Sequence, residues 1–490
     1  MPEDNLKTSV LSSLFWKSLE RGGVSGVQFI VQIILARLLL PEDYGVIALI
    51  VVFIAISQTF VQSGLGTALI QKRKVTDADY SSVFYLSLGV ALVFYCILFL
   101  GAPAIAAFYN QPLITPVLRV LGLTLFFGAV NTIQNAVIAR NFLFRKLFIS
   151  SLGAVLLSGV VGIALAYAGY GVWALVGQQL ISAIALCIIM WFTVQWRPKL
   201  IFSVARVREL FSFGWKLLVS GLIDTTYRNL SSLIIGKLYP VSMLGYYTKG
   251  KEFPNVLVSN IDSSIQAVMF PAYAKNQDNR PMVKQIMRRA LVTSAFLVFP
   301  AMAGLAAVAE PLIELLLTDK WLIAVPFLQI FCAVYALWPI HTVNLQAINA
   351  LGRSDVFLKL EILKKIVGVS MLAVTVPIGI YAMALGMVVT GIIGTFINAY
   401  PSKRLLNYSF TEQWRDLMPA LILSLVMCGV TYSVLFLGLS VWATLGLQIA
   451  VGVVVYVGLA WVVGLESLTY VLNTVREYFP SRMKRAECLK

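Results

Sequence analysis

A stripe of polar side chains runs through the first long apolar segment of this chain. Lys17, Arg21, Ser25, Gln28 and Gln32 are spaced 4, 4, 3 and 4 residues apart, which keeps them on one face of a helix. A stripe of this kind inside a membrane has to face something other than lipid. Its chemistry is anion binding by the cations and hydrogen bonding by the hydroxyl and amides.

Three further segments carry polar faces of the same kind. An isolated polar side chain in a membrane span more often joins helices than contacts a ligand, but five on one face are a stronger indication of a hydrated cavity. The series are Lys216, Ser220, Asp224, Tyr227 and Ser231, each 199 residues after a member of the first stripe; Glu252, Asn255, Ser259, Asp262 and Gln266; and the shorter Gln58, Gln62 and Gly66.

The charged members of these stripes each have a structural alternative, because a charge inside a membrane is costly unless it is paired or hydrated. For Lys17 we favour a side chain that reaches the cytoplasmic interface. For Arg21, a role in anion binding and a role in a structural ion pair are equally supported by the sequence. Asp224 and Arg228 lie four residues apart, which favours a structural pair over a direct role in ligand binding.

The remaining charged candidates lie in the second half of the chain. Lys249 and Glu252 stand in the outer part of their segment, where interfacial anchoring competes with a ligand role. Asp262 and His341 are candidates for carrying a coupling proton. A single histidine, however, is more often a hydrogen-bonded interior residue.

Enzyme chemistry has little support in this sequence. There is no P-loop, no glycine-rich dinucleotide fingerprint and no HExxH motif, so we predict no catalytic residue, no metal and no cofactor. Five cysteines and one histidine form no disulfide framework or metal spacing. The outer loops are short, and their one acidic group, Glu310, Glu314 and Asp319, is more consistent with a solvated loop and helix end.

Long apolar segments must position the polar stripes, because 59% of the residues are hydrophobic and only 12% are charged. A helix needs roughly 18 mostly apolar residues to cross the hydrocarbon layer of a membrane. Helices are the expected element, since backbone groups in lipid must be satisfied within the segment. Fourteen such segments are predicted, at 11–39, 44–70, 81–108, 113–139, 147–168, 171–195, 210–236, 244–272, 287–309, 321–349, 356–377, 381–401, 417–437 and 441–464.

The distribution of lysine and arginine predicts the topology. These residues concentrate in alternate loops, such as Lys72-Arg73-Lys74, and basic loops stay on the cytoplasmic side. We therefore expect a multi-pass protein with both termini in the cytoplasm. The net charge of +16 reflects this topology and attraction to anionic membrane lipids, so it gives little support to nucleic-acid binding.

The chain also contains a duplication. Trp16-Lys17 stands 25 residues before Pro41, and Trp215-Lys216 stands 25 residues before Pro240. Residues 109–179 realign on 319–389, which places Asn131 on His341 and Gln134 on Asn344. Six helices in each copy give both copies the same orientation, with a pseudo-twofold axis along the membrane normal.

The predicted fold is therefore an all-α membrane protein with two six-helix lobes and two extra helices. Its parts are an N-lobe at 1–197, a C-lobe at 198–408, helices 13 and 14 at 409–464, and an amphipathic, basic cytoplasmic tail at 465–490. Helices 1, 2, 7 and 8 are expected to line one cavity. The tail stripe from Leu468 to Phe479 predicts a helix on the inner membrane surface, and a helix that docks on a partner would look the same.

Several short strings resemble the Wzx-type polysaccharide flippases of the multidrug/oligosaccharidyl-lipid/polysaccharide exporter superfamily. The strings are Ala36-Arg37-Leu38-Leu39-Leu40-Pro41-Glu42-Asp43-Tyr44-Gly45, Gly64-Leu65-Gly66-Thr67-Ala68-Leu69-Ile70-Gln71, Gly169-Tyr170-Gly171-Val172-Trp173-Ala174-Leu175 and Leu244-Gly245-Tyr246-Tyr247. The resemblance covers residues 10–464 and is nearest to the branch that exports colanic and teichuronic acids.

The resemblance implies a transporter in the bacterial inner membrane. Its cargo would be an undecaprenyl-diphosphate-linked oligosaccharide, moved from the cytoplasmic to the outer leaflet by alternating access with an ion gradient, and polysaccharide polymerase or assembly proteins are candidate partners. The diphosphate contacts would be Arg21, then Lys17, Arg228 and Lys249; the coupling candidates are Asp224, Glu252, Asp262 and His341. The sugar-facing candidates are Ser25, Gln28, Gln32, Gln58, Gln62, Asn131, Gln134, Tyr227, Asn344 and Asn349.

Two other functions stay open at this point. One is a cation-coupled exporter of small molecules on the same scaffold, which predicts an acidic cavity. The other is a scaffold of a polysaccharide assembly complex that transports nothing. Basic residues outnumber acidic ones on the inner helices, and this favours an anionic cargo over cationic drugs.

Overall fold

A computed structural model of the chain describes residues 16, 17 and 19–469, and within them it contains helices and no strand. The side chains of Arg21, Phe213, Ser264, Ala267, Val268 and Phe270 lie outside this description. The packing of the chain divides it into two compact units, Met1–Thr248 and Lys249–Lys490. The predicted surface helix of the tail falls mostly on residues 470–490, outside the described residues.

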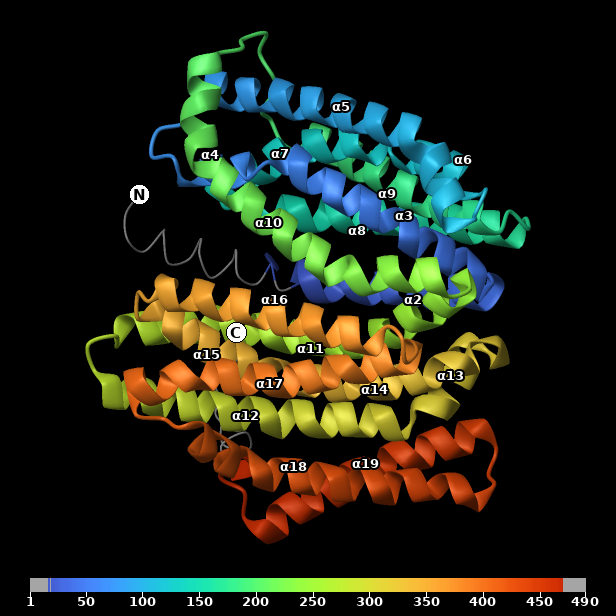
Figure 1. The fold of residues 1–490 in the computed structure, drawn as a ribbon, viewed down its shortest axis with the longest axis vertical. Coiled ribbons are helices and arrows are strands. Elements are labelled where there is room, and N and C mark those ends of the chain that lie inside the picture. Colours follow the sequence, from blue (N-terminus) through green and yellow to red (C-terminus); the bar gives the residue numbers. More distant parts are fainter. Residues whose placement is uncertain (1–15, 18, 470–490) are drawn as a thin grey trace, which may run out of the picture. The chain divides into compact units, whose positions relative to one another are not determined.

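The first unit is built from an irregular entry turn and long helices (Figure 1). Its elements, in chain order, are η1 (Glu20–Val24), α2 (Ser25–Leu38), α3 (Pro41–Gln62), α4 (Leu65–Gln71), α5 (Asp77–Tyr109), α6 (Ile114–Leu121), α7 (Thr124–Arg140), α8 (Phe144–Tyr167), α9 (Val172–Thr193) and α10 (Val204–Leu238). The start of α11 (Val241–Lys275) also belongs to this unit.

The second unit continues from α11. Figure 1 shows α18 and α19 as an antiparallel pair, and α18 packs along α12. The elements are α12 (Arg280–Ala307), α13 (Ala309–Leu317), η2 (Asp319–Ala324), α14 (Val325–Ala336), α15 (Trp338–Ala350), α16 (Ser354–Thr375), α17 (Ile380–Leu406), α18 (Phe410–Ser433), η3 (Val434–Leu437) and α19 (Val441–Val463).

Over its described residues, each predicted apolar segment coincides with one helix or with consecutive helices, and the chain is a multi-pass membrane protein. Among the described residues, ten helices are long and apolar enough to cross a membrane. The helix at Gly22–Leu38 is shorter, and α10, α11 and α16 carry charged residues along their length. The count of fourteen spans therefore stays a prediction.

Local sequence sets several helix boundaries. The segment predicted at 44–70 is broken between α3 and α4, where Ser63 and Gly64 both adopt left-handed backbone conformations with φ of 48° and 63°. The hydroxyl of Thr76 and the carboxylate of Asp79 cap the start of α5. Ser409 and Glu412 cap α18 in the same way.

Apolar packing holds the helices of each unit together. In the first unit, Leu65, Leu69, Val83 and Ile133 form one core where α4, α5 and α7 meet. In the second, α18 and α19 pack on α12, where the Tyr456 hydroxyl donates a hydrogen bond of 3.0 Å to the Phe296 carbonyl oxygen. The predicted lobe boundaries follow the duplication rather than this packing, and they stay a prediction.

Candidate functional site

The entry to the first polar stripe is irregular. A π-helical turn occupies Glu20–Val24, and such turns are common at functional sites. Lys17 forms an ion pair of 2.7 Å with Glu20, whereas the side chain of Arg21 lies outside the described residues. Farther along this face, Ser25 is half-buried and Gln28 is exposed. Of these positions, Gln28 presents its side chain most openly.

Two predicted sugar contacts instead pack inside the first unit. The Gln32 amide on α2 donates a hydrogen bond of 3.2 Å to the Gln178 side chain on α9. The Gln58 amide lies against the backbone of Gly128 on α7, where even one added methyl group would overlap it. Helical spacing places these glutamines on a polar face, but that face contacts neighbouring helices at both positions. Gln62, at the end of α3, is exposed.

The polar face of α10 carries an ion pair. The Arg228 Nε donates to the Asp224 Oδ2 at 2.7 Å, as the spacing of four residues predicts. Both side chains are largely exposed within the described structure. Tyr227 lies half-buried between them in sequence. Arg228 therefore already has a carboxylate partner in Asp224, and an anionic ligand would have to compete with it.

The second unit holds the remaining charged candidates. The Lys249 Nζ lies 2.7 Å from the Glu252 Oε2, and the lysine side chain is buried. Asp262 is also buried and accepts a hydrogen bond of 2.8 Å from Gln266. Gln266 in turn accepts from Gln346 on α15 at 3.2 Å. The acidic and amide groups of α11 are thus joined to α15 rather than isolated.

Repeat-related positions on α7 and α15 have different surroundings. His341 forms a hydrogen bond of 2.9 Å with the Asn398 amide on α17, as an interior histidine does. Its counterpart Asn131 is buried, and so is Gln134, the counterpart of Asn344. Within the described chain, the Asn131 Oδ1 and both polar atoms of Gln134 have no hydrogen-bond partner. Asn349 is half-buried.

Asn344 is predicted to face sugar, but the structure places it in the core of the second unit. Its Oδ1 accepts from the Ser402 hydroxyl at 2.8 Å, and its Nδ2 donates to the Gln413 Oε1 at 2.9 Å. All three side chains are at most 1% exposed. Three helices, α15, α17 and α18, therefore meet at this asparagine.

Replacing Asn344 with leucine is expected to lower the free energy of unfolding by about 2–3 kcal/mol, because it leaves buried polar groups of its two partners unpaired. Thermal unfolding of the purified variant in detergent measures this change. Asn349→Leu is the matched control, and we expect it to unfold within about 0.5 kcal/mol of the wild type. An unfolding temperature unchanged by Asn344→Leu would contradict the network.

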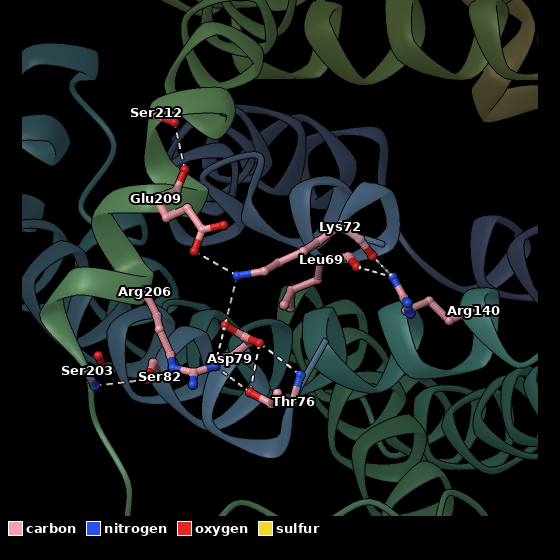
Figure 2. Close-up of polar contacts among 10 residues, drawn as sticks. All are labelled: Leu69, Lys72, Thr76, Asp79, Ser82, Arg140, Ser203, Arg206, Glu209 and Ser212. Atoms are coloured by element: carbon pink, nitrogen blue, oxygen red, sulfur yellow. Dashed lines mark hydrogen bonds and ion pairs between the residues drawn. The ribbon is translucent and has the colours of Figure 1, made fainter. Parts of the chain in front are cut away.

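The polar stripes did not predict one ionic cluster of the structure. It surrounds Asp79, a fully buried carboxylate at the start of α5 (Figure 2). In the sequence, only the helix-capping motif from Thr76 to Asp79 indicates this cluster. The motif follows the basic loop residues Lys72-Arg73-Lys74, from which the topology is predicted. The described residues contain no group of three or more His, Cys, Asp or Glu side chains that could hold a metal ion.

Comparison with known proteins gives a consistent result. The profile of the family described as "Polysaccharide biosynthesis protein" matches residues 34–326. The succinoglycan biosynthesis transport protein ExoT of Rhizobium meliloti is 26% identical over 327 residues, which are 67% of this chain and 66% of that protein. The lipopolysaccharide biosynthesis protein WzxC of Escherichia coli is 24% identical over 433 residues, which are 88% of each chain.

A solved structure shares the fold. The lipid II flippase MurJ, in an inward closed conformation, superposes with a TM-score of 0.76 at 13% identity, over 92% of this chain and 98% of that one. At this level of identity the likeness concerns the arrangement of helices alone. It agrees with the all-α membrane architecture that the apolar segments predict.

Proposed function

Because the chain belongs to the polysaccharide biosynthesis protein family, we propose that it is a transporter that flips a lipid-linked oligosaccharide between membrane leaflets. The family match across residues 34–326 carries this proposal. The cargo is an undecaprenyl-diphosphate-linked repeat unit, moved from the cytoplasmic to the outer leaflet of a bacterial inner membrane. The activity moves cargo and makes or breaks no covalent bond.

The physical demands of such cargo fit a helical membrane protein with polar faces. A sugar diphosphate headgroup is anionic and rich in hydroxyl groups, so its passage through lipid requires cations and hydrogen-bonding side chains. The polyprenyl chain can remain in the lipid. We propose alternating access driven by an ion gradient, with both termini in the cytoplasm and with polymerase or assembly proteins as partners.

Three of the four candidate diphosphate contacts already form ion pairs within the protein. Lys17, Arg228 and Lys249 each have a carboxylate 2.7 Å away, so a phosphate would have to compete with a group of the protein. Arg21, whose side chain lies outside the described residues, keeps the leading place that the resemblance gives it. Gln28 is the leading sugar contact because its side chain is exposed. The coupling candidates Asp224, Glu252, Asp262 and His341 keep their place as proposals.

The function is tested by deleting the gene and by reconstitution of the purified protein. We expect lipid-linked repeat units to accumulate on the cytoplasmic leaflet of the deletion strain. The purified chain in liposomes should expose a fluorescent lipid-linked oligosaccharide to the opposite leaflet. Unchanged glycolipid would favour the small-molecule exporter. Loss of glycan in cells without flipping in liposomes would favour the scaffold.

Arg21→Ala is expected to reduce the flipping rate about tenfold, which corresponds to about 1.4 kcal/mol for the loss of a charge-assisted contact. Arg21→Lys should retain most of the rate because it keeps the charge. Arg228→Ala is the comparison, and we expect a smaller loss because Asp224 already neutralises this cation. Equal rates for Arg21→Ala and the wild type would remove Arg21 from the cargo path.

A further inference from the structure

Asp79 lies at the centre of an ionic cluster at the start of α5 (Figure 2). Its carboxylate is fully buried and accepts hydrogen bonds of 2.8 Å from the backbone N–H and the hydroxyl of Thr76. It also accepts a hydrogen bond of 3.2 Å from Lys72 and forms an ion pair of 3.1 Å with Arg206. Three hydrogen bonds and one further ion pair therefore converge on one carboxylate, and Arg206 brings the start of α10 into the cluster.

The cluster extends beyond this carboxylate. The Lys72 Nζ lies 2.8 Å from Glu209, also on α10, and this hydrogen bond raises the pKa of Lys72 above its ordinary value, with a further contribution from Asp79 and opposition from burial. Arg140, at the end of α7, donates to the carbonyl oxygens of Leu69 and Lys72. One set of contacts thus joins α4, α5, α7 and α10.

The chain that leads into α10 is fixed to the same place. The Ser81 hydroxyl accepts a hydrogen bond of 2.9 Å from the backbone N–H of Lys199, and the Ser82 hydroxyl accepts one of 3.0 Å from the backbone N–H of Ser203. Both serines are buried on α5. These bonds hold the backbone of the connection itself, so α10 begins at a set position on the first unit.

Small residues then let α10 lie directly against α3. The hydroxyl oxygens of Thr59 and Thr225 are 3.3 Å apart. A Cβ on Gly214 would lie 2.9 Å from the Ser63 carbonyl oxygen, and one on Gly221 would lie 3.2 Å from the Thr59 methyl group. Contacts of this length leave no layer of large side chains between the helices. The attachment therefore extends along α10 from its first turn into its middle.

The second unit attaches its following helix in a comparable way. Lys284 on α12 pairs with Glu412 on α18 at 3.2 Å, and Arg288 on α12 pairs with Asp416 on α18 at 2.9 Å. In the first unit the carboxylate is on α5 and the cation on α10; here the signs are reversed. For each repeat of six predicted spans, the helix that follows the repeat forms ion pairs with the third span, α10 with α5 and α18 with α12.

We propose that α10 moves with the first unit throughout the transport cycle, although the duplication places it at the start of the second repeat. The moving body would then end within α11, after Thr248, and not at the repeat boundary near residue 198. This inference rests on the proposed transport function. It makes the Asp79 cluster the attachment that positions the polar face of α10.

A disulfide between α3 and α10 tests this inference. Thr59→Cys and Thr225→Cys are introduced together into the full chain after its five native cysteines are replaced with serine. Flipping of the fluorescent lipid-linked oligosaccharide is measured in liposomes before and after oxidation. The two single-cysteine chains control for the oxidant, and Thr59→Cys with Gly221→Cys is a second pair should the first one fold poorly.

If α10 stays on α3, the oxidised and reduced proteins should flip cargo at rates within about twofold of each other. A fall of about tenfold or more on oxidation, reversed by a reductant, would show that the helices must separate and would overturn the inference. The wild-type rate tests the proposed function separately.

A second measurement does not depend on cargo. The crosslinked fraction is measured by mass spectrometry in membrane vesicles with and without an ion gradient. Nearly complete crosslinking under both conditions supports the inference, and a fraction that falls under one condition overturns it.

Discussion

Gly45→Ala is expected to lower the free energy of unfolding by about 3 kcal/mol, because the added methyl group has no room. The first turns of α3 and α11 meet with their backbones in contact. A Cβ on Gly45 would lie well inside 3.0 Å of the Val241 carbonyl oxygen, and one on Gly245 would do the same at the Pro41 carbonyl oxygen. Backbone cannot rotate away as a flexible side chain can. The two helices would therefore have to move apart.

Thermal unfolding in detergent, followed by size-exclusion chromatography, measures this effect. We expect Gly245→Ala to be equally harmful. Gly89→Ala is the matched control, because no atom lies within 4 Å of a Cβ at that position on α5. Alanine favours a helix over glycine by roughly 0.5–1 kcal/mol, so the control should be neutral or slightly stabilised. Similar unfolding temperatures for Gly45→Ala and the control would contradict the close helix contact.

The positions of the helices could be predicted from the sequence because the thickness of the lipid layer sets their length. The run at 81–108, for example, lies within α5 at Asp77–Tyr109. The break at Ser63 and Gly64 is harder to predict, since it occurs inside an apolar run; in the folded chain Gly214 lies against both residues. The sequence strings that contain Gly45 and Gly245 resemble those of a known family. The structure shows why glycine stands at both positions, because α3 and α11 approach too closely for a larger side chain.

The candidate site was predictable only in part, because helical spacing tells which residues share a face but not what that face contacts. It placed Asp224 and Arg228 within reach of each other, and they do pair. It could not tell that Gln32 reaches α9 or that Asn344 lies among three helices. Those partners are 146 and 69 residues away in the chain.

The Asp79 cluster shows a further limit of pattern reading. Positive residues in a loop predict topology, and that use of Lys72 left no reason to pair it with a buried carboxylate. The carboxylate belongs to a capping motif, which is a local feature. Its ion pair with Arg206 joins residues that are far apart in the chain. Such a pairing follows from the folded arrangement of helices, which single-sequence periodicity does not contain.

Asp79→Asn is expected to destabilise the first unit by about 3–5 kcal/mol, because it removes the buried anion that faces Lys72 and Arg206. The amide keeps the size of the side chain, so cavity formation contributes little. Lys72 retains Glu209, whereas Arg206 loses its ion-pair partner and keeps only the Thr76 hydroxyl among its hydrogen bonds within the described residues. An apparent unfolding temperature lower by roughly 5–15 °C is the expected readout in detergent.

Asp77→Asn is the control that separates burial from charge. Asp77 pairs with Lys199 at 2.6 Å only two residues away from Asp79, but both side chains of that pair are about half exposed. An exposed pair contributes about 0–1 kcal/mol, so the control should unfold within about 3 °C of the wild type. If both variants lose the same stability, the general loss of negative charge beside a basic loop explains the effect. If only Asp79→Asn does, the buried carboxylate holds α10 in place.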